Sequence, residues 1–196
     1  TKIAALGCNN TATCTANRKF MFAPDVVVEP APNSGTHILL IGSGDREKPL
    51  RDYTSAYGVS NYFFMLKDVP TDSTWLSTNM GTCPSANVMC LDSLYGITGS
   101  DDPVAADLAT KKGWYLGRNA HEQVVTSAIT VFGGTTFSTH TPTVPDPDAC
   151  ASDLGTARVY NIRYNNAAPS KPNATNRYEE ISGGGLPPSP VPGQVK

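Results

Sequence analysis

The sequence predicts an all-β fold built from short strands and long loops. Gly and Pro together occupy 33 of the 196 positions, and breakers of regular backbone at this density exclude a bundle of long helices. The apolar stretches are short, end at turn-forming residues and recur about every 20 residues, which is typical of a β-sandwich or a β-propeller. The pattern does not separate these two architectures. At this length, a single domain over residues 1–196 is expected to bury a core of its own.

Two continuous apolar runs predict strands that are buried on both faces. Residues 37–42 read HILLIG and residues 61–68 read NYFFMLKD, and each run is bounded by Gly, Asn, Ser or Pro. A shorter strand is expected at residues 113–116. Residues 19–22 and 26–28 form a further β-rich stretch, which is interrupted by Pro24.

A β-hairpin is the clearest supersecondary prediction. Residues 122–132 and 135–140 are β-rich arms on either side of Gly133 and Gly134, and two glycines accept the positive φ angles of a tight hairpin turn. Residues 156–164 alternate polar and apolar side chains, as a half-buried strand does.

The remaining segments are predicted to be irregular. Residues 1–18 form a loop, residues 71–101 form a long insertion loop, and residues 165–196 form a connection rich in Pro and Gly. One short helix is expected over residues 104–110, because Ser, Asp and Pro directly before it suit the start of a helix.

The charge of the chain excludes some partners. Fifteen basic and 17 acidic residues give a formal net charge of −2, with no block of like charges. The chain therefore lacks the cluster of basic residues with which nucleic-acid-binding proteins contact phosphates. The longest apolar run, residues 38–41, is far too short to span a membrane.

The cysteines predict two disulfide-stapled loops. Cys8 and Cys14 lie close together in one polar stretch, and Cys83 and Cys90 in another. A zinc site is disfavoured, because neither pair has C-x2-C spacing and no His lies near either pair. Disulfides imply an oxidising compartment. Cys150 is left over, as a reactive thiol, as part of an intermolecular bridge, or with a partner outside this sequence.

Motifs for metal binding or catalysis are weak. Asp146, Asp148 and Asp153 lie close together and are the best metal candidates, but Pro147 stands where a calcium loop needs a flexible turn. Ser127 lies in a predicted strand rather than on a nucleophile elbow. The Gly-Ser-Gly of residues 42–44 lacks the other residues of a phosphate loop. No catalytic residue is assigned, and the chain is not expected to be an enzyme.

Six motifs follow one another along nearly the whole chain: LIGSGDREKPL at 40–50, NYFFMLKD at 61–68, KGWYL at 112–116, EQVVTS at 122–127, FSTHTP at 137–142 and GGLPPSPV at 184–191. This set, in this order, resembles the C-terminal β-propeller of the PilY1 family, the bacterial type IV pilus biogenesis and tip adhesin proteins called PilC in Neisseria.

The resemblance implies that the chain is a set of propeller blades, part of a larger propeller, in which the strand at residues 37–42 pairs with the strand at residues 61–68. It also implies that Cys150 finds its partner beyond residue 196. The family's calcium loop would lie upstream of Thr1, so no cofactor is assigned to this chain. The expected partners are minor pilins and a host or surface ligand. The expected location is the pilus tip or outer membrane, reached through the periplasm.

Two alternatives to a pilus-associated adhesin remain open. A quinoprotein-type propeller dehydrogenase shares the blade architecture, but it would need repeated Trp motifs and the chain has only Trp75 and Trp114. A subunit of an extracellular filament would associate with itself through unpaired edge strands.

Overall fold

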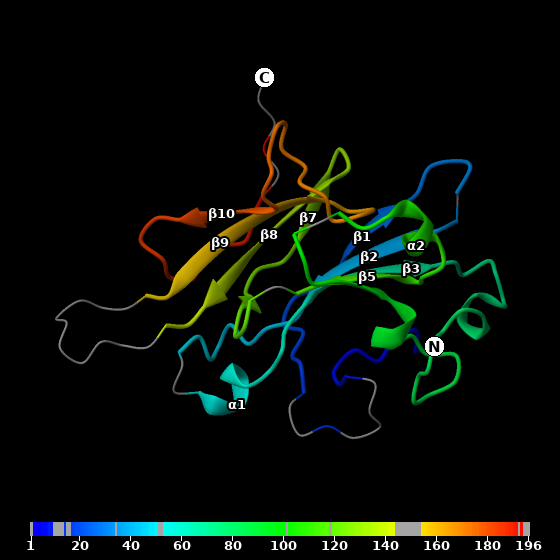
Figure 1. The fold of residues 1–196 in the computed structure, drawn as a ribbon, viewed down its shortest axis with the longest axis horizontal. Coiled ribbons are helices and arrows are strands. Elements are labelled where there is room, and N and C mark those ends of the chain that lie inside the picture. The colour runs from blue at the N-terminus through cyan, green and yellow to red at the C-terminus, as the bar shows by residue number, and fades with distance from the viewer. Residues whose placement is uncertain are drawn as a thin grey trace.

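The computed structural model describes residues 2–9, 14, 17–33, 35–50, 53–100, 102–117, 119–143, 154–191 and 193. These residues form two five-stranded sheets with little helix (Figure 1), which confirms the predicted all-β class. The helical elements of the described residues are single turns: α1 Thr54–Tyr57, α2 Ala105–Ala109, and the 3-10 turns Trp75–Ser77 and Leu91–Ser93.

The first sheet has the strand order β1-β2-β3-β5-β4. Neighbouring strands are antiparallel, except that β4 runs parallel to β5. The pairing of β2 with β3 agrees with the pairing that the family resemblance implies. The strands are β1 Asp25–Val28, β2 His37–Gly42, β3 Phe63–Asp68, β4 Tyr95–Ile97 and β5 Gly113–Leu116.

The second sheet has the strand order β10-β9-β8-β6, and β7 also pairs with β8. All of its pairings are antiparallel. Its longest strands, β8 and β9, pair along their whole length. The strands are β6 Gln123–Val124, β7 Ile129–Val131, β8 Gly134–Thr141, β9 Thr156–Arg163 and β10 Tyr178–Ile181.

The main hydrophobic core lies between the two sheets. Phe63 of β3 stacks on Phe137 of β8, with ring centroids 3.8 Å apart and an angle of 2° between the rings. Phe137 also stacks on Tyr160 of β9, with 4.9 Å between centroids. Trp114 of β5 and Ile162 of β9 are completely buried in the same cluster. Each sheet therefore buries one face against the other.

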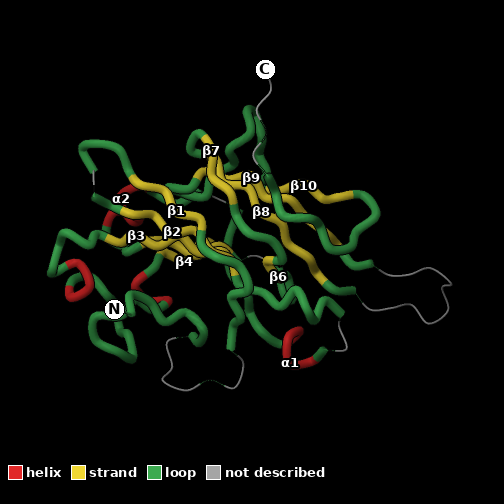
Figure 2. Tube along the Cα trace, turned by 180° about the vertical axis from the view of Figure 1, so that it is seen from behind, coloured by secondary structure: helices red, strands yellow, loops and turns green. Residues whose placement is uncertain are grey.

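The opposite face of the first sheet is covered by loops. Phe64 and Leu66 of β3 pack there against Leu6, Met89 and Leu91, among others. The backbone N–H of Ala5 donates to the carbonyl of Met89 at 2.8 Å, which attaches the N-terminal segment to the loop after β3. Figure 2 shows these loops below the strands of the first sheet.

Most of the predicted strands are present, and the differences have local causes. Residues 19–22 form no strand. The predicted arm at residues 122–132 is divided into β6 and β7. The hairpin between β7 and β8 is present, but Val131 pairs with Gly134, so the turn residues are Phe132 and Gly133. Both have positive φ, 50° and 82°.

The predicted loops contain some regular structure. The insertion at residues 71–101 includes both 3-10 turns and β4, and the connection at residues 165–196 includes β10. The predicted helix begins one residue later than expected, at Ala105, and its N-cap is Val104, which makes no side-chain cap. Asp102 instead forms an ion pair with the buried Arg177, with 2.9 Å between Oδ1 and Nη2.

Candidate binding site

The Gly-Ser-Gly-Asp segment at the end of β2, residues 42–45, joins the two sheets. The N–H of Ser43 donates to the carbonyl of Tyr62, and the N–H of Val124 donates to the carbonyl of Ser43, at 2.9 and 3.0 Å. The N–H of Asp45 donates to Oε1 of Gln123 at 2.7 Å. These bonds fix the end of β2 against both β3 and β6.

The two glycines of this segment are required because neither position has room for a side chain. A β-carbon at Gly42 would lie 2.3 Å from Cγ1 of Val124, and one at Gly44 would lie 2.3 Å from the carbonyl oxygen of Val124. Neither distance is compatible with a side chain. The glycines therefore allow β6 to approach the first sheet closely, as glycine does where two backbones meet.

A pocket of about 210 Å³ opens beside this segment, next to α1. Figure 1 shows α1 below both sheets, at the end of the chain segment that leaves β2. Ala56 and Val59, both buried, form the apolar part of the lining. The polar side chains of the lining are Asn17, Lys19, Asp45, Lys48, Ser55, Asn61 and Gln123.

Asp45 is the most buried charged group of the pocket, with only 5% of the residue exposed. Its Oδ2 accepts a hydrogen bond from Nζ of Lys19 at 2.6 Å. This bond is the main reason that the pKa of Lys19 is raised above its ordinary value. Oδ1 of Asp45 and Oδ1 of Asn61 are buried and have no hydrogen-bond partner among the described residues.

The lining of this pocket combines carboxylate and amide oxygens with the ammonium groups of two lysines, and none of the described residues that line it is a His or a Cys. In the sequence, the charged turn at residues 45–48 could be either a binding tip or a salt-bridged turn, and the folded chain adds Asn61 and Ser55 to the pocket from other segments.

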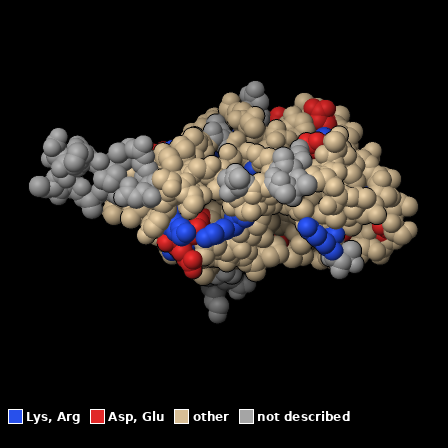
Figure 3. Space-filling view, turned by 90° about the horizontal axis from the view of Figure 1, so that it is seen from below, with Lys and Arg blue, Asp and Glu red and all other residues tan. Residues whose placement is uncertain are grey.

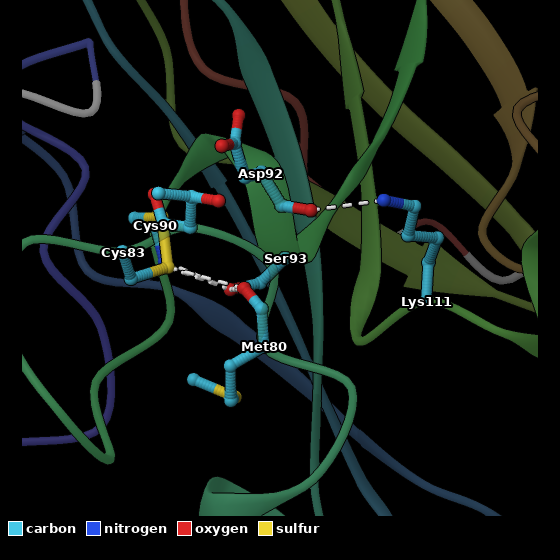
Figure 4. Close-up of a disulfide and its surroundings, with 7 residues drawn as sticks. Met80, Cys83, Cys90, Asp92, Ser93 and Lys111 are labelled. Atoms are coloured by element: carbon cyan, nitrogen blue, oxygen red, sulfur yellow. Dashed lines mark hydrogen bonds between the residues drawn. A yellow bond between two sulfur atoms is a disulfide. The ribbon is translucent and has the colours of Figure 1, made fainter.

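Both predicted disulfides are present in the structure, Cys8 with Cys14 and Cys83 with Cys90. The Cys83–Cys90 loop is fixed by Ser93, whose Oγ donates to the carbonyl of Met80 at 2.6 Å and lies 3.2 Å from Sγ of Cys83 (Figure 4). Nζ of Lys111 donates to the carbonyl of Asp92 at 2.9 Å. The disulfide thus anchors the loop that covers the first sheet.

The other predicted site residues lie outside the described part of the chain. This applies to Cys150 and to the weak metal candidates Asp146, Asp148 and Asp153. Among the described residues, no group of three or more His, Cys, Asp or Glu side chains is placed to hold a metal ion.

A buried carboxylate, Glu122, was not singled out in the sequence. Its Oε1 accepts hydrogen bonds from Thr139 at 2.5 Å and from Tyr160 at 2.9 Å. Its Oε2 accepts from Asn119 at 2.5 Å and lies 3.3 Å from Nη1 of Arg158. The cavity beside it measures only about 20 Å³, room for about one water molecule. Glu122 therefore connects side chains of the second sheet by hydrogen bonds and leaves no space beside it for a ligand larger than water.

The tip of the β7–β8 hairpin is a second exposed feature that the sequence only partly indicated. Phe132 is fully exposed there, in a left-handed conformation that few non-glycine residues adopt. A shallow depression of about 460 Å³ lies beside it, lined among others by Arg163 and Tyr164. The Gly-Gly motif predicted the hairpin but not the exposed aromatic side chain.

Charged side chains do not form an extended basic area on the face shown in Figure 3, where blue and red atoms are few and partly lie together. Some lysines are instead partly buried. Burial lowers the pKa of Lys67, against the opposing charge of Glu29, and its Nζ donates to the carbonyl of Leu108 at 3.2 Å. No helix of the described residues is both long and apolar enough to cross a membrane.

Comparison with known proteins shows a distant similarity to a solved structure. No protein-family model and no curated protein matches the chain. Among solved structures, the chain is similar to the C-terminal domain of PilY1 from Pseudomonas aeruginosa, with 15% sequence identity and a TM-score of 0.49. The match covers 78% of this chain and 32% of that one, so the chain spans about a third of the length of the PilY1 domain. The relation is a distant resemblance at the level of the fold.

Proposed function

We propose that the chain is a non-enzymatic binding scaffold of the bacterial cell surface that acts in type IV pilus biogenesis and tip adhesion. Its two sheets would be neighbouring blades of a PilY1-type propeller. The observation that carries this proposal is where the PilY1-like motifs lie: the segments at residues 40–50, 61–68, 122–127 and 137–142 all contribute to the junction between the two sheets.

The physical properties of this junction support the proposal. The stack of Phe63 on Phe137 and the contact of Gly42 with Val124 join sheets from distant parts of the sequence. Face-to-face packing of small antiparallel sheets is how propeller blades bury their apolar surface. The two disulfides are consistent with an extracellular location reached through an oxidising compartment.

The proposal is tested by measuring binding of the purified, oxidised chain to immobilised minor pilins of the source bacterium. We expect saturable binding that is lost when the same chain is reduced and unfolded. Absence of binding by a chain with both disulfides intact and a native near-ultraviolet circular dichroism spectrum would contradict the pilus role. A quinone absorbance band in the purified protein would favour the dehydrogenase alternative.

Self-association is a second candidate function, which the edge strand β1 favours. Val26 and Val28 are 51% and 60% exposed on this edge, and exposed apolar edge strands pair readily with other chains. We expect sedimentation velocity to show concentration-dependent assembly that Val26→Lys abolishes. A monomer at all concentrations would rule out the filament role for this chain.

A further inference from the structure

We propose that the tip of the β7–β8 hairpin is an interface for a protein partner whose contacting segment carries an apolar side chain close to a carboxylate. This hairpin tip consists of Val131, Phe132 and Gly133 together with Arg163 and Tyr164 at the end of β9. All five residues lie outside the six PilY1-like motifs. The inference therefore goes beyond the proposed pilus role and does not depend on it.

The ring of Phe132 is not buried by the fold. Phe132 is fully exposed, and its φ of 50° is followed by a φ of 82° at Gly133. A two-residue turn with two positive φ angles favours Asn-Gly, because few other side chains accept this conformation. The adjoining Val131 is 43% exposed. An aromatic ring that is held in a disfavoured backbone conformation without being buried is available to a partner.

Hydrogen bonds hold the hairpin tip in a fixed position. The backbone N–H of Tyr164 donates to the carbonyl of Gly133 at 3.2 Å. The carbonyl of Tyr164 accepts from Nε1 of the buried Trp114 at 3.1 Å. The hydroxyls of Thr130 and Thr135 lie 2.8 Å apart across the two strands. A partner would not have to order this turn, which lowers the entropic cost of binding.

The hairpin tip carries a positive charge without an acidic counterpart. Arg163 is exposed and forms no ion pair with another described residue, whereas Arg158 and Arg177 are each paired with carboxylates. None of the described residues that line the depression beside Phe132 is Asp or Glu. The guanidinium group of Arg163 is therefore free to bind a carboxylate of a partner, which it can do through two parallel hydrogen bonds.

The combination of an arginine with aromatic side chains is typical of the centre of a protein–protein interface. The depression of about 460 Å³ is lined by Phe132, Tyr164 and Ile129 among others, so it offers apolar surface to a side chain of the partner. A second copy of this chain fits less well, because two copies meeting at their tips would bring Arg163 of each together without a carboxylate. Charge complementarity thus favours an acidic and apolar segment of another protein.

Peptide selection tests the proposal. A displayed library of random dodecapeptides is selected on the immobilised, oxidised chain after peptides that bind the variant Phe132→Asn have been removed. We expect the remaining peptides to be enriched in Asp or Glu close to a large apolar residue, and synthetic copies to bind the chain saturably in fluorescence anisotropy. Absence of any peptide that prefers the parent chain, or enrichment of peptides without acidic residues, would overturn the proposal.

Two pairs of variants locate the interface. Phe132→Asn removes the ring and supplies a residue that suits a positive φ, so the fold should keep its stability while the affinity for the selected peptides falls about tenfold or more. Its matched control is Val104→Asn, at a residue that is 62% exposed and outside the lining. Val104→Asn should leave the affinity unchanged.

The charge is tested by a residue that the selection did not use. Arg163→Gln should lower the affinity about tenfold and weaken its dependence on salt, because the ion pair with the peptide is lost. Lys2→Gln removes an exposed positive charge outside the lining and should change neither. An unchanged affinity in Arg163→Gln would overturn the proposal.

The same variants identify the other possible occupants of the hairpin tip. Assembly of the parent chain in sedimentation velocity that Phe132→Asn abolishes would assign the tip to a second copy. Binding to phosphatidylglycerol vesicles that Phe132→Asn abolishes would assign it to a lipid surface. Either result would overturn the proposal. Since no pilin is present in these experiments, their outcome is independent of the proposed pilus role.

Discussion

The two sheets are stabilised in different ways. The first sheet is apolar on both faces: Phe63 faces the second sheet and Phe64 faces the stapled loops, and both are at most 2% exposed. The second sheet buries polar groups, among them Glu122, Thr135 and Thr139. Burial of apolar area stabilises the first sheet, whereas in the second sheet these three polar groups are buried with hydrogen-bond partners of their own. The first is therefore expected to tolerate polar substitution less, and the second to depend more on individual partners.

The largest effect is expected where the two sheets meet. Phe63→Ala removes the ring that stacks on Phe137 and should lower the free energy of unfolding by about 3–5 kcal/mol. Urea denaturation followed by circular dichroism measures this. Val28→Ala, 60% exposed on the same sheet, is the control and should change stability by about 0.5 kcal/mol or less. Equal effects of both variants would contradict the shared core.

Opening the staple over the first sheet is expected to have the next largest effect. Replacing Cys83 and Cys90 together by Ala should lower the free energy of unfolding by about 2–3 kcal/mol, because the unfolded chain gains the freedom of the closed loop. Parallel denaturation curves with and without reductant measure the change. The difference between parent and variant should shrink in reductant, and a difference that persists unchanged would contradict the role of the disulfide.

The second sheet is probed by its buried carboxylate. Glu122→Gln keeps the shape of the side chain but removes the charge that faces Arg158, and should cost about 2 kcal/mol. Glu180→Gln is the matched control, because Glu180 pairs with the same arginine at 2.9 Å but its side chain is 59% exposed. The control should cost about 1 kcal/mol at most. Thermal unfolding of both variants shows whether the buried carboxylate contributes more to stability than the exposed one.

The smallest effect concerns pH. Burial lowers the pKa of Lys67 in the folded chain, so between its folded and unfolded pKa the unfolded chain holds a proton that the folded chain has released. Stability should therefore rise with pH over this interval. In Lys67→Met this rise should be smaller. Measuring the free energy of unfolding from neutral pH to about pH 10 tests this expectation. If the free energy of unfolding rose equally with pH in the parent and the variant, burial of Lys67 would be contradicted.

The comparison of the sheets also explains how much of the fold the sequence predicted. The runs at residues 37–42 and 61–68 were recognised because strands covered on both faces read as continuous apolar stretches. Strand β10, with the sequence YEEI, carries no such signal and lies in a segment that was predicted to be irregular. It forms because β9 offers it an unpaired edge, which is a tertiary effect.

The candidate site was less predictable than the fold. The disulfides followed from local spacing, since each pair closes a short loop. The pocket combines Asp45, Ser55 and Asn61 with Lys19, and only the folded chain brings the N-terminal segment to the turn after β2. Glu122 was missed for the same reason, because its partners lie on β8 and β9.

The short span of the two disulfides has a consequence for how the chain folds. Their cysteines are 6 and 7 positions apart, whereas the backbone bond from Ala5 to Met89 joins segments more than 80 positions apart. Closing a short loop costs little entropy, and long-range contacts form more slowly. Both bridges can therefore close before the sheets assemble, and in an oxidising compartment the unfolded chain would acquire its covalent links early, without waiting for distant segments to meet.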